Sequence, residues 1–244
     1  MDNRLRGWTG ELFTLIAGQH QEQLSVQRGV LERIPHFQQA LNGQNWIEVN
    51  ERKFLLPEYE AETVANVIFY VHTGHVQELD YQSERPTEEQ AEKVVSYVRE
   101  WILADRWGAE ATANALVDEI GRYHGDRPVN PELVSILAAA DLQESPFYSY
   151  LIGDLASEVN LQTYEGWHVY GSTDEEGNYT GQGPTFKEVC DRLPSEVLVR
   201  LLVDSQNSNL GESPYERVST NLCSLHKHKQ TNSCGKEPPS KKAA

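Results

Sequence analysis

The residues best suited to bind a metal lie close together near the C-terminus. Cys223, His226, His228 and Cys234 offer four ligands of the kinds that zinc prefers. Their spacing matches no standard zinc finger, and the segment has almost no apolar residues to pack around a metal. The alternative is a His/Lys-rich tail without a metal. We favour that alternative, and we expect neither a structural metal nor a cofactor.

A second group of chemically capable residues lies between positions 164 and 184. Trp167, His168 and Tyr170 precede an acidic run at 174–176, and together they could line a pocket. The sequence shows no nucleophile paired with a base, and position 185 is threonine where a calcium loop would need glutamate. A small-molecule-binding or hydrolytic protein with its site at 164–184 therefore stays as the alternative function, and we do not expect an enzyme.

Charge and composition exclude several other classes of protein. The 244 residues carry a formal net charge of −16, which would repel the phosphates of nucleic acid. From Ser219 onward the sequence contains five lysines and one acid, Glu237, so this tail is basic and the rest of the chain has a net charge more negative than −16. The sequence contains no run of 18 apolar residues, so it predicts no membrane helix. Three cysteines give no disulfide framework, so we expect an intracellular protein, cytoplasmic or nuclear.

The first third of the chain predicts a small α+β unit. Residues 11–17 form a β-rich run, and residues 22–27 alternate between polar and apolar after a polar turn, which is typical of a β-hairpin. Pro35 predicts a helix start, and residues 53–56 predict a third short strand. A helix led by Glu58, Glu60 and Glu62 should follow and end at Gly74. Its expected buried face consists of Val64, Val67, Ile68 and Val71.

The rest of the chain predicts mainly helices. Acidic, proline-marked residues up to position 90 predict a linker, and two apolar stripes then follow with helical spacing, separated by Gly108. Asn130-Pro131 and Ser145-Pro146 each combine a capping residue with a proline suited to the first helical position. Residues 186–203 predict a last helical stretch, bent at Pro194. The stripes comprise Ala91, Val94, Val95, Val98, Trp101 and Ile102, then Ala109, Ala113, Leu116, Val117 and Ile120.

Several segments, in this order, resemble the BTB/POZ domain, especially its fungal form. They are Phe13–Gly18, Val26–Leu31, Ile34–Gly43, Phe54–Glu58, Val71–Val76 and, more loosely, Leu103–Gly108. The resemblance implies a domain that binds other proteins and performs no chemistry. It also implies two roles: an adaptor that links a cullin ubiquitin ligase to a partner, or a protein that self-associates.

The resemblance also points to two positions at the surface through which many BTB domains dimerise. The family carries an acid just before the first strand, paired with a basic residue. Here the register places Leu12 at the acid position, while Arg28 keeps the basic one. A buried arginine without a counterion is costly, so we expect a monomer, or a dimer formed through another surface.

These observations together predict an α+β protein with four parts. A BTB/POZ-like domain with a short three-stranded sheet and helices should occupy 1–78, and an acidic linker 79–90. A helical extension should occupy 91–205, with the loop or hairpin of 164–184 inserted. Residues 206–244 should form a disordered basic tail. The expected partners are proteins, a cullin or a second copy, and neither nucleic acid nor membrane.

Overall fold

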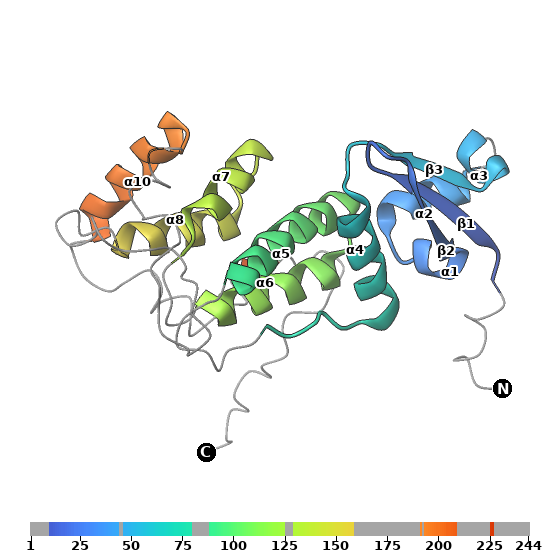
Figure 1. The fold of residues 1–244 in the computed structure, drawn as a ribbon, viewed down its shortest axis with the longest axis horizontal. Helices are drawn as coiled ribbons and strands as arrows, with labels where there is room; N and C mark the ends of the chain where they lie inside the picture. The colour runs from blue at the N-terminus through green and yellow to red at the C-terminus, as the bar shows by residue number, and fades with distance from the viewer. Residues whose placement is uncertain are drawn as a thin grey trace, which may run out of the picture. The chain divides into compact units, whose positions relative to one another are not determined.

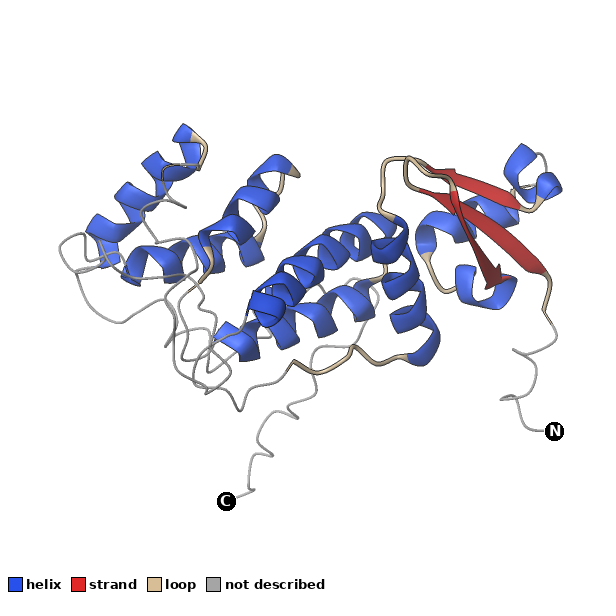
Figure 2. Ribbon diagram, viewed as in Figure 1, coloured by secondary structure: helices blue, strands red, loops and turns tan. Residues whose placement is uncertain are grey.

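The structure is a computed structural model that describes residues 10–43, 46–79, 88–124, 129–158, 191, 193–208 and 225–226. The described residues form an α+β protein of one short sheet and many helices (Figures 1 and 2). The chain divides into two compact units, one of residues 1–80 and 89–120 and one of residues 81–88 and 121–244. In the described part, no helix is both long enough and apolar enough to cross a membrane.

The sheet of the first unit is three-stranded and mixed. Strands β1 (Leu12–Ala17) and β2 (Glu22–Gln27) form the expected antiparallel hairpin, and β3 (Lys53–Leu56) lies parallel to β1 on its other side. The order is therefore β2-β1-β3. Alternate residues of β1 and β3 are buried, as the period of a strand with one covered face requires. The predicted three-stranded sheet is confirmed.

Six helices accompany this sheet among the described residues up to position 124. Proline occupies the first position of α2, as predicted. The sequence did not predict α3, because a five-residue helix is too short to show an apolar period. The helices are α1 (Arg28–Leu31), α2 (Pro35–Asn42), α3 (Ile47–Glu51), α4 (Ala61–Thr73), α5 (Glu88–Trp107) and α6 (Glu110–His124).

Helix α4 differs from its prediction in where it starts and which face it buries. It begins at Ala61, so Glu58 and Glu60 precede it and only Glu62 lies in its first turn. Its buried face includes Val64, Val67 and Tyr70. Ile68 and Val71 are half-buried, so the expected face was wrong for these two. The face is rotated because α4 packs on the hairpin and also reaches a polar cluster on α5 through Asn66. The predicted end at Gly74 is confirmed, with φ of 75°.

The first unit continues well past residue 78, where we expected its end. Both predicted apolar stripes are buried, on α5 and α6. The start of the expected linker packs against these helices: the Leu79 N–H donates to Oε1 of Glu119 over 2.6 Å, and the Tyr97 hydroxyl donates to the Gln77 carbonyl. These bonds tie the segment after α4 to α5 and α6. The unit therefore includes α5 and α6 as far as Ile120.

An aromatic cluster joins α5 to the sheet and to α2. The Phe37 ring lies 4.9 Å from the Trp107 ring and 5.0 Å from the Phe54 ring, measured between centroids. Gly108 follows with φ of 70°, and a Cβ there would lie 3.3 Å from the Pro35 ring. Glycine thus permits both the left-handed turn and the close approach to α2.

The second unit contains helices α7 (Pro131–Ala139), α8 (Pro146–Glu158) and α10 (Ser195–Ser208). Both predicted caps are present. The Asn130 side chain accepts from the Glu132 N–H over 3.0 Å, and the Ser145 hydroxyl accepts from the Tyr148 N–H over 3.0 Å. Helix α8 packs against α7 and α10.

The expected insertion and tail are described only in part. Residues 164–184 lie outside the described residues, so the expected hairpin or loop there remains a prediction. Helix α10 runs to Ser208, past the expected tail boundary at 206. Leu225 is buried, so the expectation of a disordered tail was wrong for this residue. Apart from residues 206–208, Leu225 and His226, the tail lies outside the described part.

Candidate protein-interaction surfaces

The candidate chemical sites of the sequence fall mostly outside the described residues. Of the four potential zinc ligands only His226 is described, while Cys223, His228 and Cys234 are not. The side chains of 164–184 are not described either. Across the described ranges, no three His, Cys, Asp or Glu side chains lie close enough together to hold a metal ion. The arrangement that can be built from the structure is a set of exposed surfaces on the first unit.

Arg28 has counterions, so the expectation that it lacks a partner was wrong. Its guanidinium pairs with Glu11 at 3.2 Å and with Glu32 at 2.8 Å. The acid that we sought at Leu12 is the preceding residue, Glu11, while Leu12 itself begins β1 with an exposed side chain. The hydrogen bonds to Glu32 and Glu11 raise the pKa of Arg28 above its ordinary value. A leucine at position 12 is therefore no obstacle to burying Arg28.

Glu11 also fixes the start of β3. Its Oε1 pairs with Nε of Arg52 at 2.8 Å. Arg52 ends α3 with φ of 55°, a left-handed conformation that is unusual for a residue with a side chain. One carboxylate thus links the start of β1 to α1 and to the turn that leads from α3 into β3.

Beside this turn lies an exposed apolar surface, which we call the α3–β3 surface and define by Trp46, Ile47 and Leu55. Their exposed fractions are 48%, 68% and 68%. Trp46 precedes α3, and its indole lies so close to Gly43 that a Cβ there would be 2.5 Å from the ring. Leu55 is exposed because it points away from the core between the buried Phe54 and Leu56 of β3. The sequence contained a signal for this surface, since Trp46 and Ile47 are adjacent large apolar residues in a polar segment, but we did not identify it.

The α3–β3 surface borders a groove of about 420 Å³ between α2, α3 and β3. Its apolar lining includes Phe37, Ala40 and Phe54, which belong to the buried core. The groove is therefore built on rigid, packed elements. Exposed apolar side chains beside such a groove are typical of a site that binds another molecule.

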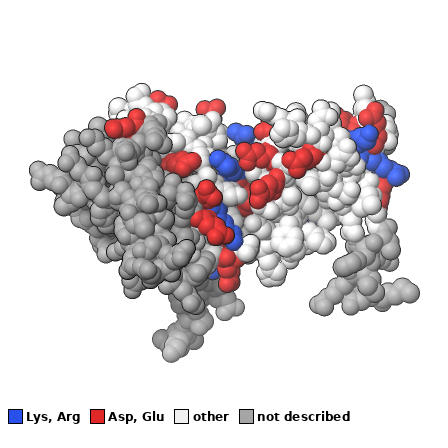
Figure 3. Space-filling view, viewed as in Figure 1, with Lys and Arg blue, Asp and Glu red and all other residues white. Residues whose placement is uncertain are grey.

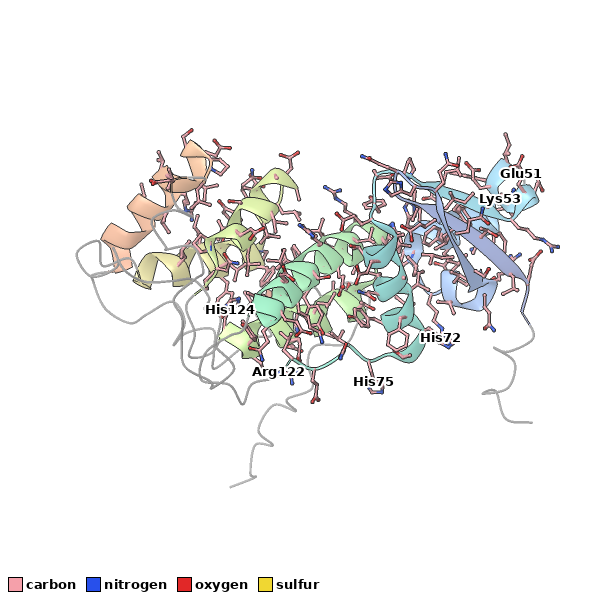
Figure 4. The ribbon with its side chains drawn as sticks, in the orientation of Figure 1. Glu51, Lys53, His72, His75, Arg122 and His124 are labelled. Atoms are coloured by element: carbon pink, nitrogen blue, oxygen red, sulfur yellow. The ribbon has the colours of Figure 1, made fainter. Side chains whose placement is uncertain are left out.

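Charged side chains surround the apolar centre of this groove. Glu48 and Glu51 come from α3 and Lys53 from β3, and Glu51 and Lys53 lie together at this end of the unit in Figure 4. Figure 3 likewise shows acidic and basic side chains gathered there. His36 also lines the groove, and its partial burial lowers the pKa of the imidazole, which favours its uncharged form. An apolar centre with a charged rim is the usual anatomy of a protein interface.

A second groove, which we call the β2–α4 groove, has a volume of about 470 Å³. Strand β2 forms one wall and helix α4 the other. Phe69 of α4 is its most exposed large apolar residue, at 55%. Sequence analysis missed Phe69, because an apolar residue beside a predicted buried helix face gives no sign of being exposed.

The first unit also buries a carboxylate, Glu100, which has an exposed fraction of 0%. Its Oε1 accepts from the Asn66 amide at 2.7 Å and from the Ser96 hydroxyl at 3.1 Å, while Oε2 has no hydrogen-bond partner. Burial raises the pKa of Glu100. Burial and the nearby Glu100 also raise the pKa of Tyr97, to about 12. The hydrogen bond between Asn66 and Glu100 joins α4 to α5. Because Glu100 is closed to solvent, we do not consider this cluster a binding site.

No model of a protein family matches the chain, and no curated protein matches it significantly.

Proposed function

We propose that this protein is a non-enzymatic protein–protein interaction module of BTB/POZ type, an adaptor that binds a partner through its α3–β3 surface. The observation that carries the proposal is the exposed apolar trio Trp46, Ile47 and Leu55 beside a groove floored by core residues. Two features support the BTB/POZ assignment: the family-like segments follow in order, and their strands form one mixed three-stranded sheet accompanied by helices.

The mechanism is burial of apolar area at a preformed site. The trio and the groove lie on α3 and β3, whose positions are fixed by the pairing of Glu11 with Arg52 and by the packing of Phe37 on Phe54. A partner that covers the three side chains removes their apolar area from water without first having to order the site. The rim acids Glu48 and Glu51, with Lys53, then select a partner of matching charge pattern.

The resemblance names a partner with which to test this proposal, the N-terminal domain of a cullin. We expect the purified chain to bind such a domain in isothermal titration calorimetry. Trp46→Ala and Leu55→Ser should each weaken binding by about 2 kcal/mol, roughly thirtyfold, as truncation of a buried interface anchor does. Both side chains are exposed, so the fold and the melting temperature should not change.

Val199→Ser is the matched control, because Val199 is as exposed as Leu55 but lies on α10 in the second unit. It should leave the affinity unchanged. Binding that the Trp46 and Leu55 substitutions do not weaken would refute the α3–β3 surface. No binding to cullin N-terminal domains would remove the cullin-adaptor role.

A further inference from the structure

The outer edge of β2 carries backbone groups that can pair with another strand. In the order β2-β1-β3, β2 is an edge strand, and within the described ranges no strand lies on its outer side. The Arg28 N–H donates to the Glu11 carbonyl at 2.8 Å. Because the backbone groups of alternate residues in a strand point to opposite sides, this bond determines which residues of β2 direct their N–H and C=O groups toward β1. Val26 and Leu24 therefore bond to β1. Gln23, Ser25 and Gln27 direct their N–H and C=O groups outward.

The hydrogen bonds of β1 agree with this assignment. The Thr14 N–H donates to the Arg52 carbonyl in the turn before β3, and the Gly18 N–H donates to the Leu56 carbonyl of β3. The alternate residues Phe13 and Leu15 thus face β2, opposite Val26 and Leu24. An unpaired row of strand donors and acceptors is a template for a further strand.

The β2–α4 groove lies beside this edge, and the described residues that line it include no Asp, Glu, Lys or Arg. Its only ionisable side chain is His72, near the C-terminal end of α4 (Figure 4). Apolar side chains of an added strand would fill it without leaving a charge unpaired. The apolar lining consists of Leu24, Val26, Val30, Ala65, Ile68 and Phe69.

We propose that β2 pairs antiparallel with β2 of a second copy of this chain, around a two-fold axis at Ser25. The two sheets then form one continuous sheet. Ser25 lies opposite Ser25 of the second copy, and Gln23 lies opposite its Gln27. Leu24 lies beside Val26 of the second copy, on the side of the β2–α4 groove. This dimer is the closed, isologous arrangement that two-fold symmetry produces.

Backbone hydrogen bonding selects this register. With Ser25 on the axis, each outward-facing residue of β2 meets an outward-facing residue of the other β2. A shift of two residues in one direction would place Gln27 opposite Gln21, which lies in the turn with φ of 54°. A shift in the other direction would place Gln23 opposite Gly29 of α1. Either shift loses hydrogen bonds at the ends of the ladder.

Charge complementarity selects the same register independently. Glu22, the first residue of β2, falls opposite Arg28 of the second copy, and the pair occurs twice because of the symmetry. The backbone hydrogen bond from Arg28 to Glu11 continues the ladder between β1 and β2, and the Arg28 side chain is 34% exposed. Glu22 and Arg28 of the second copy form a pair without backbone hydrogen bonds between them, and the side chains of such pairs approach closely. No like charges face each other between them.

The dimer leaves the α3–β3 surface available. Strands β2 and β3 are the two opposite edges of the sheet, so pairing through β2 places both α3–β3 surfaces at the outer ends of the joined sheet. The dimer does not depend on the proposed function. It would make the protein bivalent toward whatever the α3–β3 surface binds, with the gain in avidity that two linked sites give.

Sedimentation velocity of the full chain over a range of micromolar concentrations tests the proposal. We expect a concentration-dependent dimer. Ser25→Pro should be monomeric where the wild type is dimeric, because proline removes the outward N–H on the axis and blocks close pairing. Proline is tolerated at such an edge position, so circular dichroism should be unchanged. Ser25→Ala keeps the N–H and should remain dimeric.

A charge substitution tests the register without depending on Ser25→Pro folding. Glu22→Lys places like charges opposite each other twice, and should weaken the dimer about tenfold. Glu92→Lys makes the same change in net charge on an exposed part of α5, and should have no comparable effect. A wild type that is monomeric throughout, a folded Ser25→Pro protein as dimeric as the wild type, or equal effects of the two lysine substitutions would each overturn the proposal.

Discussion

At the scale of single residues, two carboxylates with opposite surroundings stabilise the first unit in different ways. Glu11 is partly exposed and pairs with Arg28 and Arg52, so it links three elements. Glu100 is fully buried and accepts hydrogen bonds from neutral side chains, among them Asn66 and Ser96. Its ionised form is therefore costly, and the protein should be less stable where Glu100 is ionised.

We expect Glu100→Gln to stabilise the protein at neutral pH and to change little under acid conditions. Because the pKa of Glu100 is raised in the folded state, its contribution to stability falls as pH rises from the ordinary glutamate pKa to the folded one. Each unit by which that pKa is raised corresponds to about 1.4 kcal/mol. Glutamine keeps an oxygen that accepts from Asn66 and Ser96. Urea unfolding at several pH values measures the difference, and a variant less stable than wild type at neutral pH would contradict it.

At the scale of elements, α4 is positioned by contacts on more than one side. Val67 is fully buried, whereas Val71, one turn later, is half-buried. The predicted period correctly indicated a helix with one apolar face. It could not indicate that Tyr70 and Asn66 would turn toward the buried carboxylate on α5, because that contact joins residues far apart in the sequence.

Two valine substitutions on α4 distinguish the observed face from the predicted one. Val67→Ala should lower the free energy of unfolding by about 2 kcal/mol, because it removes fully buried methyl groups and leaves a cavity. Val71→Ala makes the same chemical change and should cost less than about 1 kcal/mol, since part of its side chain is already in water. Chemical denaturation of both variants measures this. Equal losses would mean that the two positions are equally buried.

At the scale of the whole molecule, the chain forms two compact units, and the first of them extends beyond the acidic segment after α4 to Ile120 within α6. The second unit is built on α7, α8 and α10, and it contains the described residue Leu225. Leu225 is buried although it lies in a basic, polar tail. The tail therefore contributes at least one apolar side chain to the packed protein.

Two truncations test that contribution. A chain that ends at Ser208 loses Leu225 and should be destabilised by about 2 kcal/mol, the cost of losing a buried leucine. That loss should lower the melting temperature by several degrees. A chain that ends at His226 keeps Leu225 and should melt close to the full-length protein. Identical melting temperatures for the two truncations would show that Leu225 does not stabilise the fold.

Sequence alone determined those features of this protein that depend on neighbouring residues. The β-rich run over 11–17 and the alternation over 22–27 predicted the hairpin, and the Asn130 and Ser145 caps and the glycine at 74 marked helix ends correctly. These signals are local, because a strand period, a cap and a left-handed glycine each act within a few residues.

Only the tertiary structure decided the contacts between distant segments. The acid that pairs with Arg28 is at position 11 and not at position 12, because the ladder between β1 and β2 determines which side chain reaches Arg28. The tertiary structure also left Trp46, Ile47 and Leu55 exposed, while equally apolar residues nearby became core. Whether an apolar side chain is buried depends on which elements pack over it, and the packing of α2, α3 and β3 leaves this group exposed.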